Sequence, residues 1–159
     1  RASEKFLERI ESVHGFILKS KSPSCGIFDA KIVEPSSREV RGMGIFARKA
    51  KKFFPLVPMI DENGLRDKGR KMRFMLRAFS LTLVEKVICN YSNKADIRKL
   101  KEGFEKFFSA ETGKVSTPSS HPRDEKEELK MRFARFISRA EVKSLQKLIL
   151  FLTFPEIFD

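Results

Sequence analysis

Apolar residues in the middle of this chain recur at the spacing of an amphipathic α-helix, and this pattern constrains the fold most strongly. Between Met72 and Val87 they fall every three or four positions: Met72, Met75, Leu76, Phe79, Leu83 and Val87. Such spacing places them along one face of a single long helix. The same pattern predicts further helices at about 95–108, 124–136 and 139–152. We therefore expect the C-terminal region to be all-helical.

The first part of the chain has a different pattern, in which short apolar segments alternate with turns. The predicted elements are a helix over about 1–14, strands at 16–18 and 30–33, a helix at about 45–53 and an apolar stretch at 56–60. Pro58 makes the last of these an edge strand or a bend, because proline cannot donate to a strand ladder. Alternation of strands, loops and helices favours a layered α/β structure.

Together these patterns predict the α/β fold class: a small layered α/β unit followed by an all-helical region. We place the two parts at residues 1–88 and 89–159. A linker is expected at about 109–123, where Ser, Thr, Pro and Gly are frequent. The length of 159 residues suits one domain, or a small domain with a helical appendage.

The composition excludes several classes of protein. Two cysteines are too few for a disulfide framework, so we expect a cytoplasmic protein with reduced thiols. No apolar run approaches the roughly 20 residues of a membrane-spanning helix, so no membrane partner is expected. The charged first residues do not resemble a secretory signal, and the chain lacks an initiating Met. We expect that it begins within a longer gene product or has been trimmed.

A net charge of +12 favours binding to polyanions such as RNA. The candidate phosphate-binding residues lie on the predicted helices: Lys94, Arg98, Lys99, Lys101, Arg132, Arg135, Arg139, Lys143 and Lys147. A solvated helix face explains the same residues without any ligand. The Phe side chains follow the apolar stripes, so we expect no exposed aromatic platforms for base stacking.

The most specific motif runs from Gly15 to Gly26 and consists of Gly-Phe-Ile-Leu-Lys-Ser-Lys-Ser-Pro-Ser-Cys-Gly. Three later segments follow in order: Arg41-Gly-Met-Gly-Ile-Phe-Ala47, Pro55-Leu-Val-Pro58 and Glu62-Asn-Gly-Leu-Arg-Asp67. In wording, order and spacing, the four segments closely resemble the signature of the thiouracil desulfurase-like family. The resemblance covers about residues 6–80. In the family subgroup with this motif, a helical domain often follows.

The resemblance implies an iron–sulfur enzyme that removes sulfur from a thiolated nucleobase or nucleoside. Members of the family are α/β proteins with a [4Fe–4S] cluster held by three cysteines, and the remaining iron is left open to accept sulfur. The matching motif supplies only the third cysteine, Cys25. The other two cysteine motifs, with a glutamate thought to act in proton transfer, would precede Arg1. The resemblance therefore implies a partial domain, which is desulfurase-like only if the missing motifs are supplied.

The residues themselves also support Cys25 as the metal ligand. A ligating cysteine must be a thiolate, and tight loops place amide groups near the sulfur. Pro23 and Gly26 make this loop compact. The alternative for a lone cysteine is that of a small buried residue. Ser22 and Ser24 are the candidate catalytic residues, which place substrate or a proton, unless they only satisfy amides of the turn.

Four residues near the loop are candidates for substrate binding. Lys19 and Lys21 would steer an anionic base or polynucleotide toward the loop, although solvated lysines need no such role. Gly42 and Gly44 would let the backbone approach a ligand at a helix N-terminus, although a turn explains them equally. Cys89 matches no ligand of the family and is expected at a core or helix-end position.

Two other classes of function compete with the desulfurase. A degenerate scaffold that has lost the cluster would be a non-catalytic basic protein that binds RNA or a protein partner. In a purely structural outcome, another chain or a homo-oligomer would supply the missing strands. RNA binding that weakens steeply with salt and is indifferent to Cys25 would favour the first of these.

Overall fold

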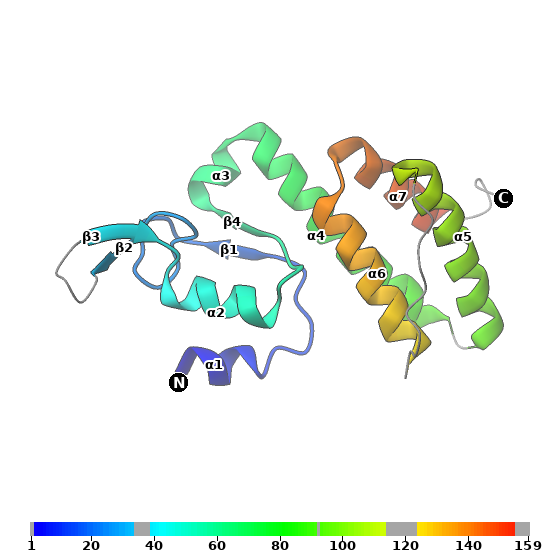
Figure 1. The fold of residues 1–159 in the computed structure, drawn as a ribbon, viewed down its shortest axis with the longest axis horizontal. Coiled ribbons are helices and arrows are strands. Elements are labelled where there is room, and N and C mark those ends of the chain that lie inside the picture. The colour runs from blue at the N-terminus through cyan, green and yellow to red at the C-terminus, as the bar shows by residue number, and fades with distance from the viewer. Residues whose placement is uncertain (1, 34–38, 92, 114–123, 155–159) are drawn as a thin grey trace. The chain divides into compact units, whose positions relative to one another are not determined.

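The computed structural model describes residues 2–33, 39–91, 93–113 and 124–154. The chain divides into two compact units, unit 1 (Arg1–Ala78) and unit 2 (Phe79–Asp159). The described residues of unit 1 form short strands and helices, and those of unit 2 form helices only (Figure 1). The predicted α/β unit followed by an all-helical region is therefore confirmed. The division falls within helix α4 (Lys68–Asn90), whereas the sequence placed it near the end of that helix.

Unit 1 is built around two pairs of short strands. Its elements are α1 (Ala2–Leu7), β1 (Phe16–Leu18), β2 (Ala30–Val33), β3 (Glu39–Gly42), α2 (Ile45–Phe53), β4 (Met59–Asp61), α3 (Glu62–Arg66) and the first part of α4. β1 and β4 are parallel, with Phe16 opposite Met59. Parallel strands require a crossover connection, and α2 lies within it. β2 and β3 form an antiparallel pair, with Ala30 opposite Gly42.

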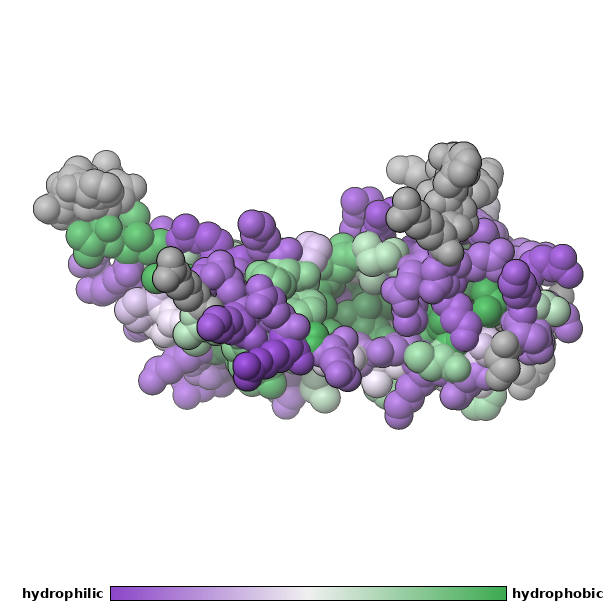
Figure 2. Space-filling model, turned by 90° about the horizontal axis from the view of Figure 1, so that it is seen from below, coloured by the Kyte–Doolittle hydropathy of each residue, from purple (hydrophilic) through white to green (hydrophobic). Residues whose placement is uncertain are grey.

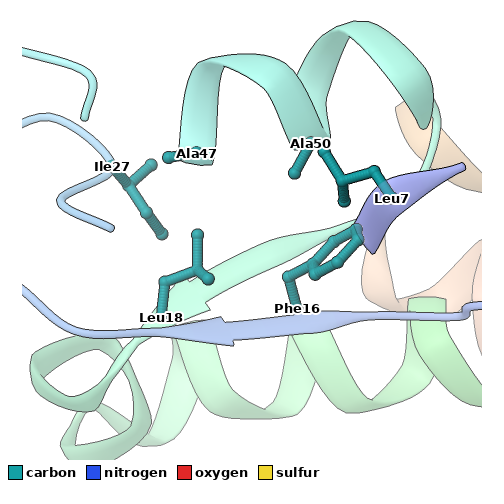
Figure 3. Close-up of a cluster of buried hydrophobic side chains, with 6 residues drawn as sticks. All are labelled: Leu7, Phe16, Leu18, Ile27, Ala47 and Ala50. Carbon is teal, nitrogen blue, oxygen red and sulfur yellow. The ribbon is translucent and has the colours of Figure 1, made fainter. Parts of the chain in front are cut away.

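The core of unit 1 lies between β1 and α2. Figure 3 shows Phe16 and Leu18 of β1 pointing toward α2, which faces them with Ala47 and Ala50. Successive side chains of a strand point to opposite faces, so the intervening Ile17 is 63% exposed. The small alanine side chains let α2 lie close to the strand. Leu7 and Ile27 complete the buried cluster.

Unit 2 consists of the rest of α4 with α5 (Lys94–Thr112), α6 (Glu125–Arg139) and α7 (Val142–Thr153). Its core is aromatic: the rings of Phe104 and Phe133 lie 4.0 Å apart between centroids. Phe107 packs edge-on against Phe136 at 5.6 Å and stacks on Phe151 at 5.4 Å. Within the described part of the chain, none of the helices combines the length and apolar character needed to cross a membrane.

Three predicted features of the secondary structure were wrong. The helix expected over 1–14 ends at Leu7. A tight turn follows, in which the Ile10 N–H donates to the Leu7 carbonyl at 3.2 Å. This bend brings Ile10 and Val13 against the core cluster. Strand β3 was missed. Residues 109–112, assigned to a linker, continue α5, which ends at the left-handed Gly113 (φ 64°). The rest of the expected linker, 114–123, lies outside the described residues.

Candidate functional site

The carboxyl ends of β1 and β4 bring together two segments that are far apart in the sequence. Residues 19–26 follow β1, and residues 62–63 follow β4. The two strands are parallel neighbours, so both segments emerge at the same edge. In open α/β sheets, ligands bind outside the carboxyl ends of the strands. This edge is therefore the candidate site, and it contains Cys25.

A hydrogen-bonded cluster of Ser20, Glu62 and Asn63 joins the two segments. The backbone N–H of Ser20 donates to Glu62 Oε2 at 2.8 Å, and the Ser20 hydroxyl donates to Glu62 Oε1 at 2.6 Å. Asn63 Nδ2 donates to Ser20 Oγ at 2.9 Å. Ser20 is only 7% exposed, so the cluster satisfies polar groups that would otherwise be buried without partners. We call this cluster the Ser20–Glu62–Asn63 clamp.

The next residue, Lys21, has a left-handed backbone with φ of 56°. This conformation is unfavourable for a residue with a Cβ, so tertiary contacts must hold it. The Lys21 N–H donates to Asp29 Oδ1 at 2.9 Å. The loop is therefore held on both sides of Lys21, by the clamp and by Asp29.

Ser22 organises the turn that carries Cys25. Its Oγ accepts hydrogen bonds from the amides of Ser24 at 3.3 Å and Cys25 at 3.1 Å. Its carbonyl accepts from the Gly26 N–H at 2.9 Å. The amides expected to surround the sulfur are therefore directed at Ser22. A hydroxyl has two lone pairs and one proton, so the Ser22 oxygen is filled as an acceptor and its proton is left to donate.

The start of α2 holds the same loop from the other side. The first amides of a helix lack partners within the helix, and the loop carbonyls supply them here. The Ile45 N–H donates to the Pro23 carbonyl at 3.2 Å. The N–H groups of Phe46 and Ala47 donate to the Ser24 carbonyl at 2.9 and 3.2 Å. These helix amides are thus engaged by the chain itself.

Gly44 permits this close packing of loop and helix. A Cβ at Gly44 would overlap the Ser24 carbonyl group and lie 2.9 Å from the Cys25 nitrogen. The Gly44 N–H donates to the Gly26 carbonyl at 2.8 Å. The sequence predicted that a ligand approaches the backbone here, whereas the group that approaches Gly44 in the structure is the loop that carries Cys25.

The remaining predicted substrate-binding residues lie around the loop. Lys19 and Lys21 are exposed on either side of Ser20, and the charge of Lys19 acts on the Glu62 carboxylate. Gly42 lies in β3, where a Cβ would meet the side chain of Ile32 at 2.8 Å. Ser24 is exposed. The structure therefore brings the lysines and serines together with Cys25, while Gly42 accommodates a neighbouring side chain.

Cys25 is half-buried and packs against the core cluster of unit 1. The cluster implied by the family resemblance needs three thiolate ligands, and Cys25 is the one cysteine of unit 1. Within the ranges that the structure describes, no three His, Cys, Asp or Glu side chains gather as a metal-binding set. The donor set therefore does not fit a cluster held by this chain alone. Cys89, exposed near the end of α4, belongs to unit 2.

Sequence reasoning missed the roles of Ser20, Glu62 and Asn63. Glu62 and Asn63 were noted only as part of a segment that resembles the family signature. A signal was available, because both lie within three residues of the end of the predicted apolar stretch at 56–60, as Ser20 lies two residues after β1. The missing information was that these two stretches pair in parallel, which places their carboxyl ends together.

Hydrogen bonds from the Ser20 hydroxyl and amide lower the pKa of the Glu62 carboxyl from 4.5 to about 2. The folded state thus binds this proton less readily than the unfolded state, so the contribution to stability is present above pH 4.5. It is lost as the pH falls toward 2. We predict that the free energy of unfolding of unit 1 falls less steeply with decreasing pH in Glu62→Gln than in wild type. The two slopes should differ by up to about one proton bound on unfolding.

Urea unfolding at stepped pH, followed by circular dichroism, measures this effect as the difference between wild type and variant. Glu4 also has a lowered pKa, because of its hydrogen bond to Lys49, and this contribution is the same in both proteins. Parallel stability curves between pH 4.5 and pH 2 would contradict the prediction.

The predicted basic residues of unit 2 lie along α5, α6 and α7, and several of them pair with acidic side chains. Lys101 pairs with Glu128 at 3.8 Å, and Arg132 pairs with Glu105. From the first pair to the second, the residue number rises in both helices, so α5 and α6 run in parallel, as Figure 1 shows. At 1.5 Å per residue, the exposed Lys94 and Arg139 therefore lie about 25 Å apart along the helix axes.

Acidic side chains offset further positive charge on this surface. Lys147 pairs with Glu111 at 2.6 Å. The first turn of α6 carries Glu125, Glu127 and Glu128. Hydrophilic residues cover most of the visible face of unit 2, on the right of Figure 2. Acidic side chains thus lie among the basic residues that were the candidates for binding a phosphate backbone.

The sequence predicted that the Phe side chains follow the apolar stripes and offer no exposed platform for base stacking, but several of them are exposed. Phe28, three residues after Cys25, is 72% exposed, and Phe6 and Phe79 are also exposed. The apolar pattern could not show the exposure of Phe28, because residues 27–28 lie in a bend outside any regular element, whereas Phe79 is exposed although it lies on the predicted apolar face of the long helix. An aromatic ring on the same loop as Cys25 is a suitable surface for a planar base.

Comparisons of the chain with protein-family models, with curated proteins and with solved structures gave no match.

Proposed function

We propose that unit 1 contributes one thiolate ligand, Cys25, to a thiouracil desulfurase-like iron–sulfur site that acts on thiolated nucleobases or nucleosides. One observation carries the proposal: the loop with Cys25 is held at the carboxyl end of a parallel strand pair. The clamp ties it to the start of α3, directly after β4, and the first amides of α2 donate to its carbonyls. Cys89, the one other cysteine of the sequence, belongs to unit 2, so the missing thiolates would have to come from outside this chain.

In this proposal, the cluster would supply an iron that can accept sulfur. The residues of this chain would help to hold the cluster and would orient the substrate. Cys25 is the ligand. Ser22 is the better candidate than Ser24 for contact with the substrate, because two amide bonds orient its oxygen and leave its proton to donate. Lys19 and Lys21 are exposed beside the loop and favour an anionic substrate.

The test is anaerobic reconstitution with ferrous iron and sulfide in excess dithiothreitol, whose thiolates fill the ligand positions that this chain lacks. We expect a brown protein with a broad visible absorption band. Cys25→Ala should retain at most about one tenth of the iron bound by wild type, because dithiothreitol can complete the cluster but does not attach it to the protein. Cys89→Ala is the matched control and should retain as much iron as wild type.

Two results would contradict the proposal. One is iron binding that is equal in wild type and Cys25→Ala, which would make the bound iron adventitious. The other is a wild-type protein that binds no iron but binds RNA with a steep salt dependence that Cys25→Ala leaves unchanged, which would favour the non-catalytic basic protein.

A further inference from the structure

We propose that Glu62 is a positioning residue that holds the Cys25 thiol in its half-buried place. It does so by fixing the start of the loop, at Ser20, to the segment that follows β4. The chemical meaning of this role, the presentation of a metal-ligating thiolate, rests on the function proposed above. The structural role is independent of it and is tested separately. Neither the sequence motif nor the family resemblance assigned Glu62 any role.

Glu62 contacts Ser20 through two hydrogen bonds. Both carboxylate oxygens of Glu62 are engaged by Ser20, one by its amide and one by its hydroxyl. Hydrogen bonds to a charged acceptor are stronger than neutral ones. Asn63, the next residue on the same segment, adds a third bond to the Ser20 hydroxyl. The contact joins residues that are 42 positions apart, so it is a tertiary tie between two segments.

The residues between Ser20 and Cys25 transmit the position of Ser20 to the thiol. Lys21 has a left-handed backbone, which a residue with a Cβ adopts only when its surroundings hold it there. Ser22 then binds the amides of Ser24 and Cys25, so the turn from Ser22 to Gly26 is closed on itself. A turn closed in this way moves as one piece, and the direction of the chain at Ser20 and Lys21 decides where it points.

The position of the turn determines how accessible the Cys25 thiol is. Cys25 is half-buried because the turn lies against the core cluster of unit 1. Release of the Ser20 end would leave the turn attached through Asp29 and the carbonyl contacts with α2. The turn would then open more often, while the strands and α2 keep their own packing. The thiol should become more accessible without loss of the fold.

The test measures alkylation of the metal-free protein by N-ethylmaleimide, with the two cysteines resolved by peptide mass. In Glu62→Gln an NH2 donor replaces one acceptor oxygen and the negative charge is lost, so the two charge-assisted bonds from Ser20 are not kept as they are. We expect Cys25 to react faster in Glu62→Gln than in wild type by several-fold, on the order of tenfold. Cys89 is the internal reference and should react at an unchanged rate. Glu11→Gln, at an exposed glutamate of the same unit, is the matched control and should leave both rates unchanged.

Hydrogen–deuterium exchange of β1, β4 and α2 separates positioning from stability. Exchange there that rises less than the alkylation rate of Cys25 supports the proposal. An unchanged alkylation rate overturns it. Exchange throughout unit 1 that rises by the same factor as the alkylation rate also overturns it, because unfolding of the whole unit, rather than opening of the turn, would then expose the thiol.

Iron binding distinguishes this inference from the function on which it rests. Faster alkylation of Cys25 in Glu62→Gln supports the clamp even if the wild type fails to retain iron, which would contradict only the desulfurase proposal. Conversely, iron that depends on Cys25 together with an unchanged alkylation rate would contradict only the role of Glu62.

Discussion

Replacement of Phe133 by alanine is expected to lower the free energy of unfolding of unit 2 by about 3–5 kcal/mol. Phe133 is 0% exposed on α6, and its ring lies 4.0 Å from that of Phe104. The substitution removes the transfer free energy of a buried ring and leaves a cavity in the centre of the aromatic core. Phe104 also packs edge-on against Phe136, so the cavity removes support from a connected set of rings.

Urea unfolding followed by circular dichroism, with hydrogen exchange to locate the change in unit 2, measures this effect. The matched control is Met131→Ala on the same helix, where the side chain is 44% exposed. It should change stability by about 0.5 kcal/mol or less, since surface substitutions rarely do more. A similar effect of the two substitutions would show that Phe133 does not lie in the core described above.

Gly44→Ala is expected to destabilise unit 1 by about 3 kcal/mol, the upper end of what added volume in a packed core costs. The new Cβ would overlap the Ser24 carbonyl group and crowd the Cys25 nitrogen, and both are backbone atoms. A flexible side chain could move aside, but here the loop must separate from α2. The separation breaks the hydrogen bonds that the α2 amides make with the loop carbonyls.

Gly69→Ala is the matched control for this substitution. Gly69 lies in α4, where a Cβ would meet only an Asp67 carboxylate oxygen at 3.5 Å, an ordinary contact distance. Alanine in a helix is favoured over glycine, so stability should rise by about 0.5–1 kcal/mol. Hydrogen exchange in α2 should increase in Gly44→Ala and stay unchanged in Gly69→Ala. Unchanged exchange in both would contradict the described contact between loop and helix.

Elements with strong local signals were predicted well from the sequence. β1, β2 and α2 have the predicted bounds, because a short apolar triplet or a run of helical spacing carries its own information. α4 and α5 were also expected, although α5 extends to Thr112. The failures came where tertiary packing overrides the local pattern. α1 ends early because the chain must turn to place Ile10 and Val13 on the core.

For the candidate site, the sequence by itself determined the loop and its chemistry: Cys25 in a Pro–Gly turn, with two serines and flanking lysines. Only the tertiary structure decided what those groups contact. It directs the loop amides to Ser22, the α2 amides to the loop carbonyls, and the Glu62 carboxylate to Ser20. The bonds of Ser22 are local to its turn, but the contact between Ser20 and Glu62, 42 positions apart, depends on the parallel register of β1 and β4, which leaves no periodic trace in the sequence.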